Sequence, residues 1–325
     1  MYSSSVITTS GPGRRAAALP ASHYSHKRLS DSLRSPKDSI DTTFTTKRRT
    51  FSWNAHYASD ATYMGRKDSL NHLVLSPSFT YTGIHGFSTS LTASHIEFTD
   101  KPVKLKNGTV LTRQRPPVLD EYDWVLGWDH DWTENFSTSI GNTHSYFDAK
   151  SPRVRSTINN DFNIGATYDF NLVVADVSGD WAHGPKTVFG QAKDYFYTMS
   201  LSHDFDYEKL FKTSGELEIE PRLSMAYGTQ NFFKLYVKAG VPTNPALQQA
   251  IEKQKKLAQF SLLNYTLAVP LTYTWKKVAF VLEWDYNIPQ NVAQGSSSSP
   301  FSVIMFDVRY TRKGKPVRLK KKSSK

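Results

Sequence analysis

Two short stretches of the sequence bring together side chains that can perform hydrolysis. In DHD, the carboxylates of Asp129 and Asp131 flank His130, a combination that aspartyl-type proteases use for acid–base chemistry. In NTHSYF, His144 precedes Ser145, the residue types of a base and its nucleophile. The first set lacks a second Asp-x-His partner. In a strand, neighbouring side chains point to opposite faces, so His144 and Ser145 cannot pair directly. We therefore expect a protein that is not an enzyme, with a hydrolase as the weakest alternative.

The remaining chemistry-bearing residue types point the same way. The chain has no cysteine, which excludes disulfides, thiolate metal sites and cysteine nucleophiles. Its ten histidines are scattered, and the one close pair is His23 and His26. No phosphate-binding loop, dinucleotide fingerprint or nucleophile elbow occurs in the sequence. We expect no metal site and no cofactor.

The carboxylates of DEYDWVLGWDHDW belong to a pattern of period two. Asp123, Asp129 and Asp131 fall on one face of an extended chain, and Trp124, Trp128 and Trp132 fall on the other. The same alternation of apolar and polar residues recurs over 161–170, 217–227, 263–275 and 278–288. Strands with one ring-rich apolar face and one charged face are typical of membrane barrels, in which the charged face lines a wet lumen. In a soluble sandwich the charged faces would have too many carboxylates for a dry core, where unpaired charges are costly.

The alternation yields twelve candidate strands, which lie near 52–63, 71–82, 87–98, 121–132, 136–147, 159–169, 172–182, 194–206, 216–230, 260–275, 278–288 and 301–311. Their links alternate between short ones, such as 83–86 and 276–277, and long ones, such as 99–120 and 183–193. This predicts an all-β fold, a transmembrane antiparallel up-and-down β-barrel of about twelve strands. Only 246–260 has the composition of a short helix.

The barrel assigns a side to each candidate residue. The residues expected to line the lumen are Asp123, Asp129, Asp131, Asp161, Glu218, Glu220, Arg222, Glu283, Asp285 and Arg309. The residues expected to form an aromatic girdle facing lipid are Trp124, Trp128, Trp132, Tyr265, Tyr273, Trp275, Trp284 and Tyr286. An acidic wall favours cations or polar neutral solutes over anions.

The two ends of the chain differ from its middle. The formal charge of +11 comes mostly from the first fifty residues and from the last stretch, YTRKGKPVRLKKKSSK. We expect a disordered Ser/Thr/Arg-rich segment over 1–50, a barrel over 51–312 and a basic tail over 313–325. The middle is nearly balanced in charge, which argues against nucleic acid as a partner. No run of about eighteen apolar residues and no convincing signal-peptide core are visible.

The stretch from Trp53 to His95, beginning WNAHYASDATYMG, resembles the start of bacterial outer-membrane β-barrel proteins, most closely the Bacteroidetes-type barrels. The strand FSVIMFDVRY resembles their C-terminal assembly signal, with Phe306, Val308 and Tyr310 on one face. The resemblance implies a bacterial outer-membrane location, with the lipid bilayer and the assembly machinery as partners. The basic tail after Thr311 departs from the family pattern. The function expected is a channel or passive transporter for small polar or cationic solutes. The alternative is a non-conducting barrel that binds or scaffolds through its long loops. The sequence leaves the solute, the oligomer and the state of the lumen open.

Overall fold

The computed structural model describes residues 44–59, 62–63, 66–67, 72–98, 103–104, 110–111, 118–147, 159–187, 190–208, 215–231, 259–292 and 298–320. The wall strands are β1 (Phe44–Ala58), β4 (His72–Thr82), β5 (Phe87–Phe98), β8 (Val118–Asp131), β9 (Phe136–Phe147), β10 (Asn160–Asp169), β11 (Val174–Thr187), β12 (Gly190–Ser202), β13 (Phe205–Glu208), β14 (Gly215–Ile219), β15 (Arg222–Gly228), β16 (Ser261–Trp275), β17 (Val278–Pro289) and β18 (Phe301–Lys320). Four short strands form two small ribbons outside the wall: β2 (Thr62–Tyr63) with β3 (Arg66–Lys67), and β6 (Val103–Lys104) with β7 (Val110–Leu111).

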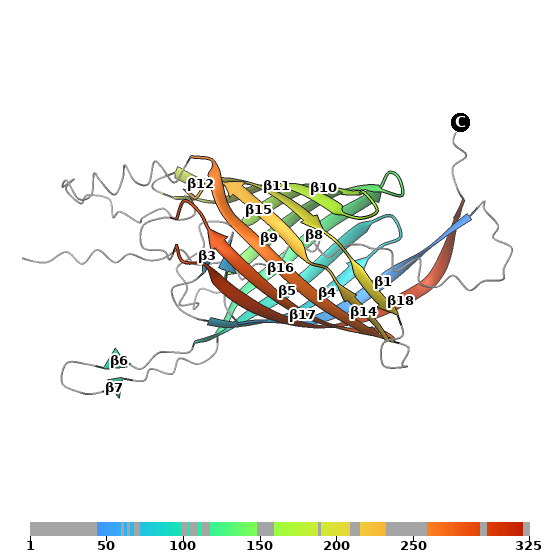
Figure 1. Cartoon of the computed structure of the whole chain (residues 1–325), viewed down its shortest axis with the longest axis horizontal. Helices are drawn as coiled ribbons and strands as arrows, with labels where there is room; N and C mark the ends of the chain where they lie inside the picture. Colours follow the sequence, from blue (N-terminus) through green and yellow to red (C-terminus); the bar gives the residue numbers. More distant parts are fainter. Residues whose placement is uncertain are drawn as a thin grey trace, which may run out of the picture.

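The wall strands close into a barrel (Figure 1). Each pairs antiparallel with its neighbours in the chain, and the first strand, β1, pairs with the last, β18. Two neighbouring wall strands are each interrupted. One consists of β12 followed by β13, and the other of β14 followed by β15. The two lie side by side, since β12 pairs with β15 and β13 pairs with β14. Counting each interrupted strand once gives the twelve-stranded up-and-down barrel that the alternation predicts.

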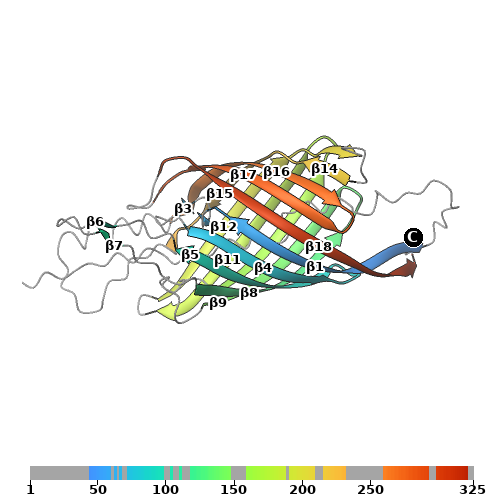
Figure 2. The ribbon, with the colours of Figure 1, turned by 90° about the horizontal axis from the view of Figure 1, so that it is seen from below.

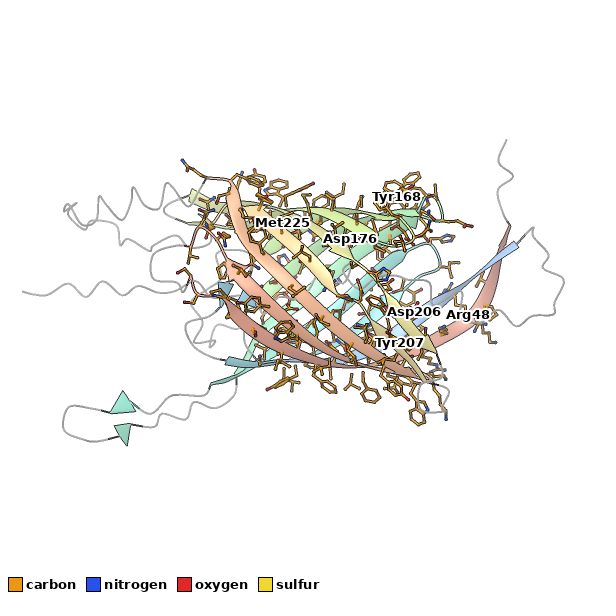
Figure 3. All side chains as sticks on the ribbon, viewed as in Figure 1. Arg48, Tyr168, Asp176, Asp206, Tyr207 and Met225 are labelled. Carbon is orange, nitrogen blue, oxygen red and sulfur yellow. The ribbon has the colours of Figure 1, made fainter. Side chains whose placement is uncertain are left out.

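The outer surface of the barrel is apolar. Side chains project from the wall around its circumference (Figure 3), and large apolar groups such as Leu91, Ile164, Leu201 and Leu282 are each more than two-fifths exposed there. So many exposed apolar side chains would be unfavourable in water, whereas a closed barrel in lipid satisfies its backbone and buries them. The exterior is therefore a lipid-facing surface, and the barrel spans a membrane. Among the described residues, no helix is long and apolar enough to cross a membrane.

One end of the barrel carries tight turns. The turn at 83–86 needs Gly86, whose φ is +85° and whose missing Cβ would lie 1.9 Å from the carbonyl oxygen of Asp129. In the turn at 170–173, Asn171 takes a φ of 71°, and the Asp169 carboxylate accepts a hydrogen bond from its backbone N–H at 2.6 Å. Asparagine tolerates this left-handed region better than most residues. We call this end the tight-turn end, and the opposite end the loop end.

The structure corrects one expected loop. The segment 183–193 was expected to be a long connection, but β11 continues to Thr187 and β12 begins at Gly190. The pairs His183↔Lys193, Lys186↔Gln191 and Thr187↔Gly190 extend this hairpin past a register shift. The expected helix over 246–260 lies almost entirely outside the described residues, which resume at 259.

The first and last strands run past the limits expected for the barrel. Strand β1 begins at Phe44 rather than near residue 51, and β18 runs on to Lys320 rather than ending near residue 312. The two extensions pair with each other, from Phe44↔Lys320 to Phe51↔Arg312. They form a two-stranded ribbon that projects from the tight-turn end in both views of the barrel (Figures 1 and 2). Residues 1–43 and 321–325 lie outside the described part of the chain.

Candidate functional site

The inner face of the barrel is polar, and a single step along a strand moves from one face to the other. On β8, the side chain of Asp123 is 3% exposed, while that of the next residue, Trp124, is 43% exposed. The wall is one layer thick, so a covered side chain in mid-strand must lie inside it. The strand alternation of period two thus sorts carboxylates inward and rings outward.

The residues expected to line the lumen differ in how deeply they lie inside. Asp123 and Glu283 are buried. The half-buried members are Asp129, Asp161, Glu218, Glu220, Arg222, Asp285 and Arg309. Asp131 is exposed, because it is the last residue of β8 and lies at the mouth of the tight-turn end. Their role in a permeation path stays a prediction.

A covered ion pair joins β15 to β17 across β16. The guanidinium of Arg222 donates to Glu283 Oε1 at 3.1 Å, with side-chain exposures of 15% and 3%. Asp285 follows two residues later on the same inner face of β17 and lies within electrostatic reach of Arg222. One guanidinium therefore balances more than one carboxylate in this sector of the wall.

A second polar group joins the first and last strands, where the barrel closes. Asp307 Oδ1 accepts a hydrogen bond from Asn54 Nδ2 at 2.8 Å and lies 3.1 Å from His56 Nδ1. Asp307 is 1% exposed, so its negative charge depends on these partners and on Arg309, the next inward residue of β18. His56 was not among the expected lumen residues, although it alternates with Trp53, Ala55 and Tyr57 in WNAHYA.

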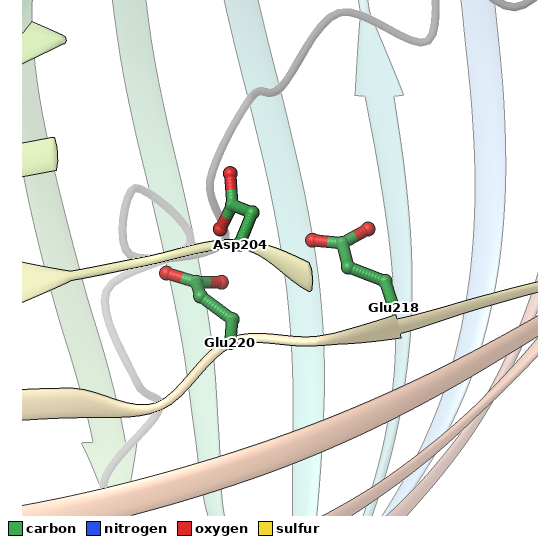
Figure 4. A group of neighbouring side chains, drawn as sticks. All are labelled: Asp204, Glu218 and Glu220. Atoms are coloured by element: carbon green, nitrogen blue, oxygen red, sulfur yellow. The ribbon is translucent and has the colours of Figure 1, made fainter. Parts of the chain in front are cut away.

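The third group is a set of three carboxylates at the two interrupted strands. Oxygen atoms of Asp204, Glu218 and Glu220 lie within 4.8 Å of one another, and the side chains gather as Figure 4 shows. The interruption has a simple cause: Pro221 and Pro270, on neighbouring strands, have no backbone N–H to donate to the ladder. Their carbonyl groups accept bonds instead, from His203 at 3.3 Å and from Glu220 at 3.1 Å.

Four further inward carboxylates were not among the lumen residues predicted from the sequence. Asp176 accepts hydrogen bonds from Thr167 at 2.6 Å and Ser200 at 3.3 Å, and Asp180 accepts one from Asn163 at 2.7 Å. Both alternate with Val177 and Trp181, so the signal was present in the sequence. Glu121 and Asp194 are also fully buried. They lie near the loop end of their strands, where the alternation is shorter and less informative.

Hydroxyl and amide groups fill much of the remaining inner face. Asn287 Oδ1 accepts from Asn264 and Thr266, both at 2.9 Å, and Ser76 and Ser94 bond at 3.1 Å. One inner region is apolar instead: Ala58, Val74, Val303 and Met305 pack together toward the loop end of β1, β4 and β18. Other covered apolar side chains, such as Phe196, Leu263 and Val281, lie among the polar ones, so the described inner face is mainly but not entirely polar.

The two hydrolytic candidates do not assemble. Ser145 is buried inside and donates to Asp123 at 2.5 Å, whereas His144 lies on the outer face against Tyr146 and Asn160. His130 lies outside as well, between the rings of Trp128 and Trp132, at centroid distances of 5.2 and 4.5 Å. Neither histidine therefore shares a face with the serine or the carboxylates beside it in sequence.

The expected girdle residues lie on the outward positions of their strands. Trp124, Trp132, Trp275 and Trp284 are exposed, and Trp128, Tyr265, Tyr273 and Tyr286 are half-buried by neighbouring side chains. The indole N–H groups of Trp124 and Trp132 donate to Thr89 and Thr138, at 3.0 and 2.9 Å. Rings that combine an apolar body with a satisfied polar tip suit a membrane interface.

Comparison with known proteins gives distant similarities only. No family model and no curated protein matches the chain. Among solved structures, the KdgM porin has a TM-score of 0.40 at 9% identity, covering 80% of this chain and 98% of that one. A NanC porin has a TM-score of 0.41 at 8% identity, covering 80% and 98%. LpxR from Salmonella typhimurium has a TM-score of 0.41 at 11% identity, covering 80% and 99%. The barrel assignment rests on the strand pairing, and the likeness to Bacteroidetes-type barrels stays a prediction.

Proposed function

We propose that this chain is a bacterial outer-membrane channel that passes small polar or cationic solutes by diffusion. The observation that carries the proposal is the sign of the inner face. Its described carboxylates include Asp123, Asp161, Asp176, Asp180, Asp204, Glu218, Glu220, Glu283, Asp285 and Asp307. The described inner guanidinium groups are Arg222 and Arg309. Such an excess of carboxylates gives the lumen a negative potential.

A negative potential in a narrow lumen selects by charge. Field lines concentrate between low-dielectric walls, and counter-ions accumulate there more than at an open surface. Carboxylate oxygens are also the donors that hard cations prefer. The group of Asp204, Glu218 and Glu220 gathers three of them at one level of the wall. A permeating cation would exchange hydration water for these oxygens, while an anion would be repelled.

The alternative proposal is a non-conducting barrel that binds or scaffolds through its loop end. One observation favours it: Glu121, Asp194, Glu283 and Asp307 are at most 2% exposed, so the interior is tightly filled around them. A lumen filled at those levels would block solutes. In either case, the lipid bilayer and the outer-membrane assembly machinery are the partners that we propose.

Planar bilayer recordings test the channel. The purified full chain should give discrete conductance steps, and its reversal potential in a salt gradient should show preference for the cation. The double variant Glu218→Gln/Glu220→Gln keeps side-chain shape while removing two charges, so cation preference should fall. The matched control is Glu134→Gln, which removes one carboxylate from an exposed turn at the tight-turn end.

The outcomes separate the two proposals. Cation preference that falls in the double variant and not in the control supports the channel. A correctly folded barrel that never conducts at neutral pH rejects the channel and supports the binding or scaffold role. Anion preference in the wild-type chain would contradict the electrostatic reasoning itself.

A further inference from the structure

The ribbon formed by the outer parts of β1 and β18 is built as a rigid extension of the wall. Residues 44–50 pair with residues 313–320, and the pairing is continuous with that of the barrel. A bulge interrupts it, because Gly314 and Lys315 together oppose Arg49. A Cβ on Gly314 would lie 3.3 Å from the Arg49 carbonyl oxygen, so glycine suits this close approach. Among the described residues, a third strand pairs with the ribbon only at its base, where Thr50 of β1 pairs with Thr82 of β4.

The ribbon carries charge of one sign only. Its sequence contains the eight cations Lys47, Arg48, Arg49, Arg312, Lys313, Lys315, Arg318 and Lys320, and no Asp or Glu. The side chains of Arg48, Arg49, Arg312, Lys313 and Lys315 are exposed, and Figure 3 shows Arg48 beyond the end of the barrel wall. Elsewhere the described tight-turn rim is of mixed charge, since exposed acids such as Asp131, Glu134 and Asp206 lie there together with the exposed cations Lys276 and Lys277. The positive charge is thus concentrated in the ribbon.

The base of the ribbon lies directly beside interface-type aromatic residues. Trp53 and Tyr310 face outward with ring centroids 5.7 Å apart, and Arg312 is the next outward residue of β18. Outward positions two residues apart are about 7 Å apart along a strand. Aromatic belts sit at the level of lipid headgroups, so Arg312 falls at the phosphate level of the leaflet. The neighbouring turn has the same order of an outward ring followed by cations. Lys276 lies 4.7 Å from the ring centroid of Trp275, and Lys277 follows it in the sequence.

We infer that this ribbon is a binding surface for anionic lipid headgroups in the leaflet at the tight-turn end. The inference needs a membrane barrel but not a conducting one. Each Lys or Arg near a negatively charged leaflet strengthens attraction by about fivefold, and the attraction fades within a Debye length of about 10 Å. Strand pairing holds the cations together, so little ordering is needed on binding. Bound anionic lipids would fix the ribbon against the leaflet and anchor the seam where the first and last strands meet.

The test measures lipid selectivity at the surface of the whole protein. The full chain is reconstituted in phosphatidylcholine vesicles at low salt, with spin-labelled phosphatidylglycerol or spin-labelled phosphatidylcholine as the probe. We expect the wild-type chain to immobilise the anionic probe at least about twofold more than the neutral one, an average over all perimeter lipids. In about 1 M salt, where the Debye length is near 3 Å, this preference should disappear.

Charge variants assign the preference to the ribbon. The variant Arg48→Gln/Arg49→Gln/Arg312→Gln/Lys313→Gln/Lys315→Gln should lose most of this preference, with Lys276 and Lys277 still present in the neighbouring turn. Two controls should keep the wild-type preference. The first is Arg48→Lys/Arg49→Lys/Arg312→Lys, which retains the charge. The second is Lys193→Gln, which removes an exposed cation near the loop end. Heat-modifiable migration in gels verifies that each variant is folded.

Three results would overturn the inference. They are equal immobilisation of both probes by the wild-type chain, a preference that is undiminished in the glutamine variant, and a preference that Lys193→Gln abolishes. If the wild-type chain captures a short DNA duplex but shows no lipid preference, the ribbon binds polyanions in solution rather than the leaflet. None of these results depends on conductance, so the channel proposal can fail while this inference stands.

Discussion

Replacing Arg222 by methionine should destabilise the barrel more than any conservative change on its inner face. The guanidinium donates at 3.1 Å to Glu283, whose side chain is 3% exposed, and Asp285 lies beside them. The Arg222→Met change keeps most of the apolar stem and leaves two carboxylates without that cation. Removing one partner of a buried pair typically costs about 3–5 kcal/mol. Because the Arg222 side chain keeps 15% exposure, we expect the lower end, about 3 kcal/mol.

The double variant separates loss of the pair from loss of packing. Glu283→Gln alone should cost less, about 1–2 kcal/mol, because a neutral amide still accepts a hydrogen bond from Arg222. Combined with Arg222→Met, it removes the uncompensated charge, so the double variant should be more stable than Arg222→Met alone. Free energies of unfolding come from guanidinium titrations in lipid vesicles, followed by tryptophan fluorescence.

One result would refute this reasoning. If the free energy of unfolding of Arg222→Met lies within about 0.5 kcal/mol of that of the wild-type chain, water replaces Arg222 as the partner of Glu283. The lumen would then be hydrated around Glu283, which favours the channel over the filled barrel. A double variant less stable than either single variant would show that packing, rather than charge, dominates this sector.

Two further predictions concern the outer wall and the turns. Leu282→Arg places a charge on the lipid-facing side of β17, where Leu282 is 48% exposed, and should cost about 2–4 kcal/mol in vesicle unfolding. The same change at Leu172, which is 74% exposed in a tight turn, should cost under about 0.5 kcal/mol, and equal effects would contradict a lipid-facing wall. Gly86→Ala should destabilise by about 1–3 kcal/mol, because its φ is +85° and the new Cβ would meet the Asp129 carbonyl oxygen. Gly83→Ala, whose nearest contact would be 3.4 Å, should be nearly neutral, so similar losses at both positions would show that conformational strain is not the cause.

The barrel itself could be predicted from the sequence because its two faces have different chemistry. A one-residue slip moves every side chain of a strand to the wrong face, so alternation such as that of 278–288 indicates both strand and register. The short turns could also be predicted from the sequence. The strands before and after Lys276 and Lys277 end and begin where the alternation does. These are local signals, and they need no knowledge of the partner strand.

The parts that sequence reasoning missed depend on partners far away in the chain. Residues 44–50 have the composition of a disordered segment, and they form a strand because residues 313–320 pair with them. The interruption at Pro221 becomes visible only when Pro270 is placed on the neighbouring strand. Likewise, nothing near Asp307 in sequence identifies its partners Asn54 and His56, which lie about 250 residues earlier. Local composition cannot report such pairings, because they depend on how the barrel closes.

The central claim is that period-two alternation separates a lipid face from a water face, and cysteine scanning along β15 tests it most directly. The chain has no cysteine of its own, so Leu223→Cys, Ser224→Cys, Met225→Cys and Ala226→Cys each give a single labelling site. A fluorophore at 223 or 225 should be quenched by brominated acyl chains, and one at 224 or 226 by aqueous iodide. Quenching of all four positions by iodide, with none by brominated lipid, would contradict a membrane-spanning barrel. Alternation in lipid quenching without any iodide quenching inside would keep the membrane barrel and reject the open lumen.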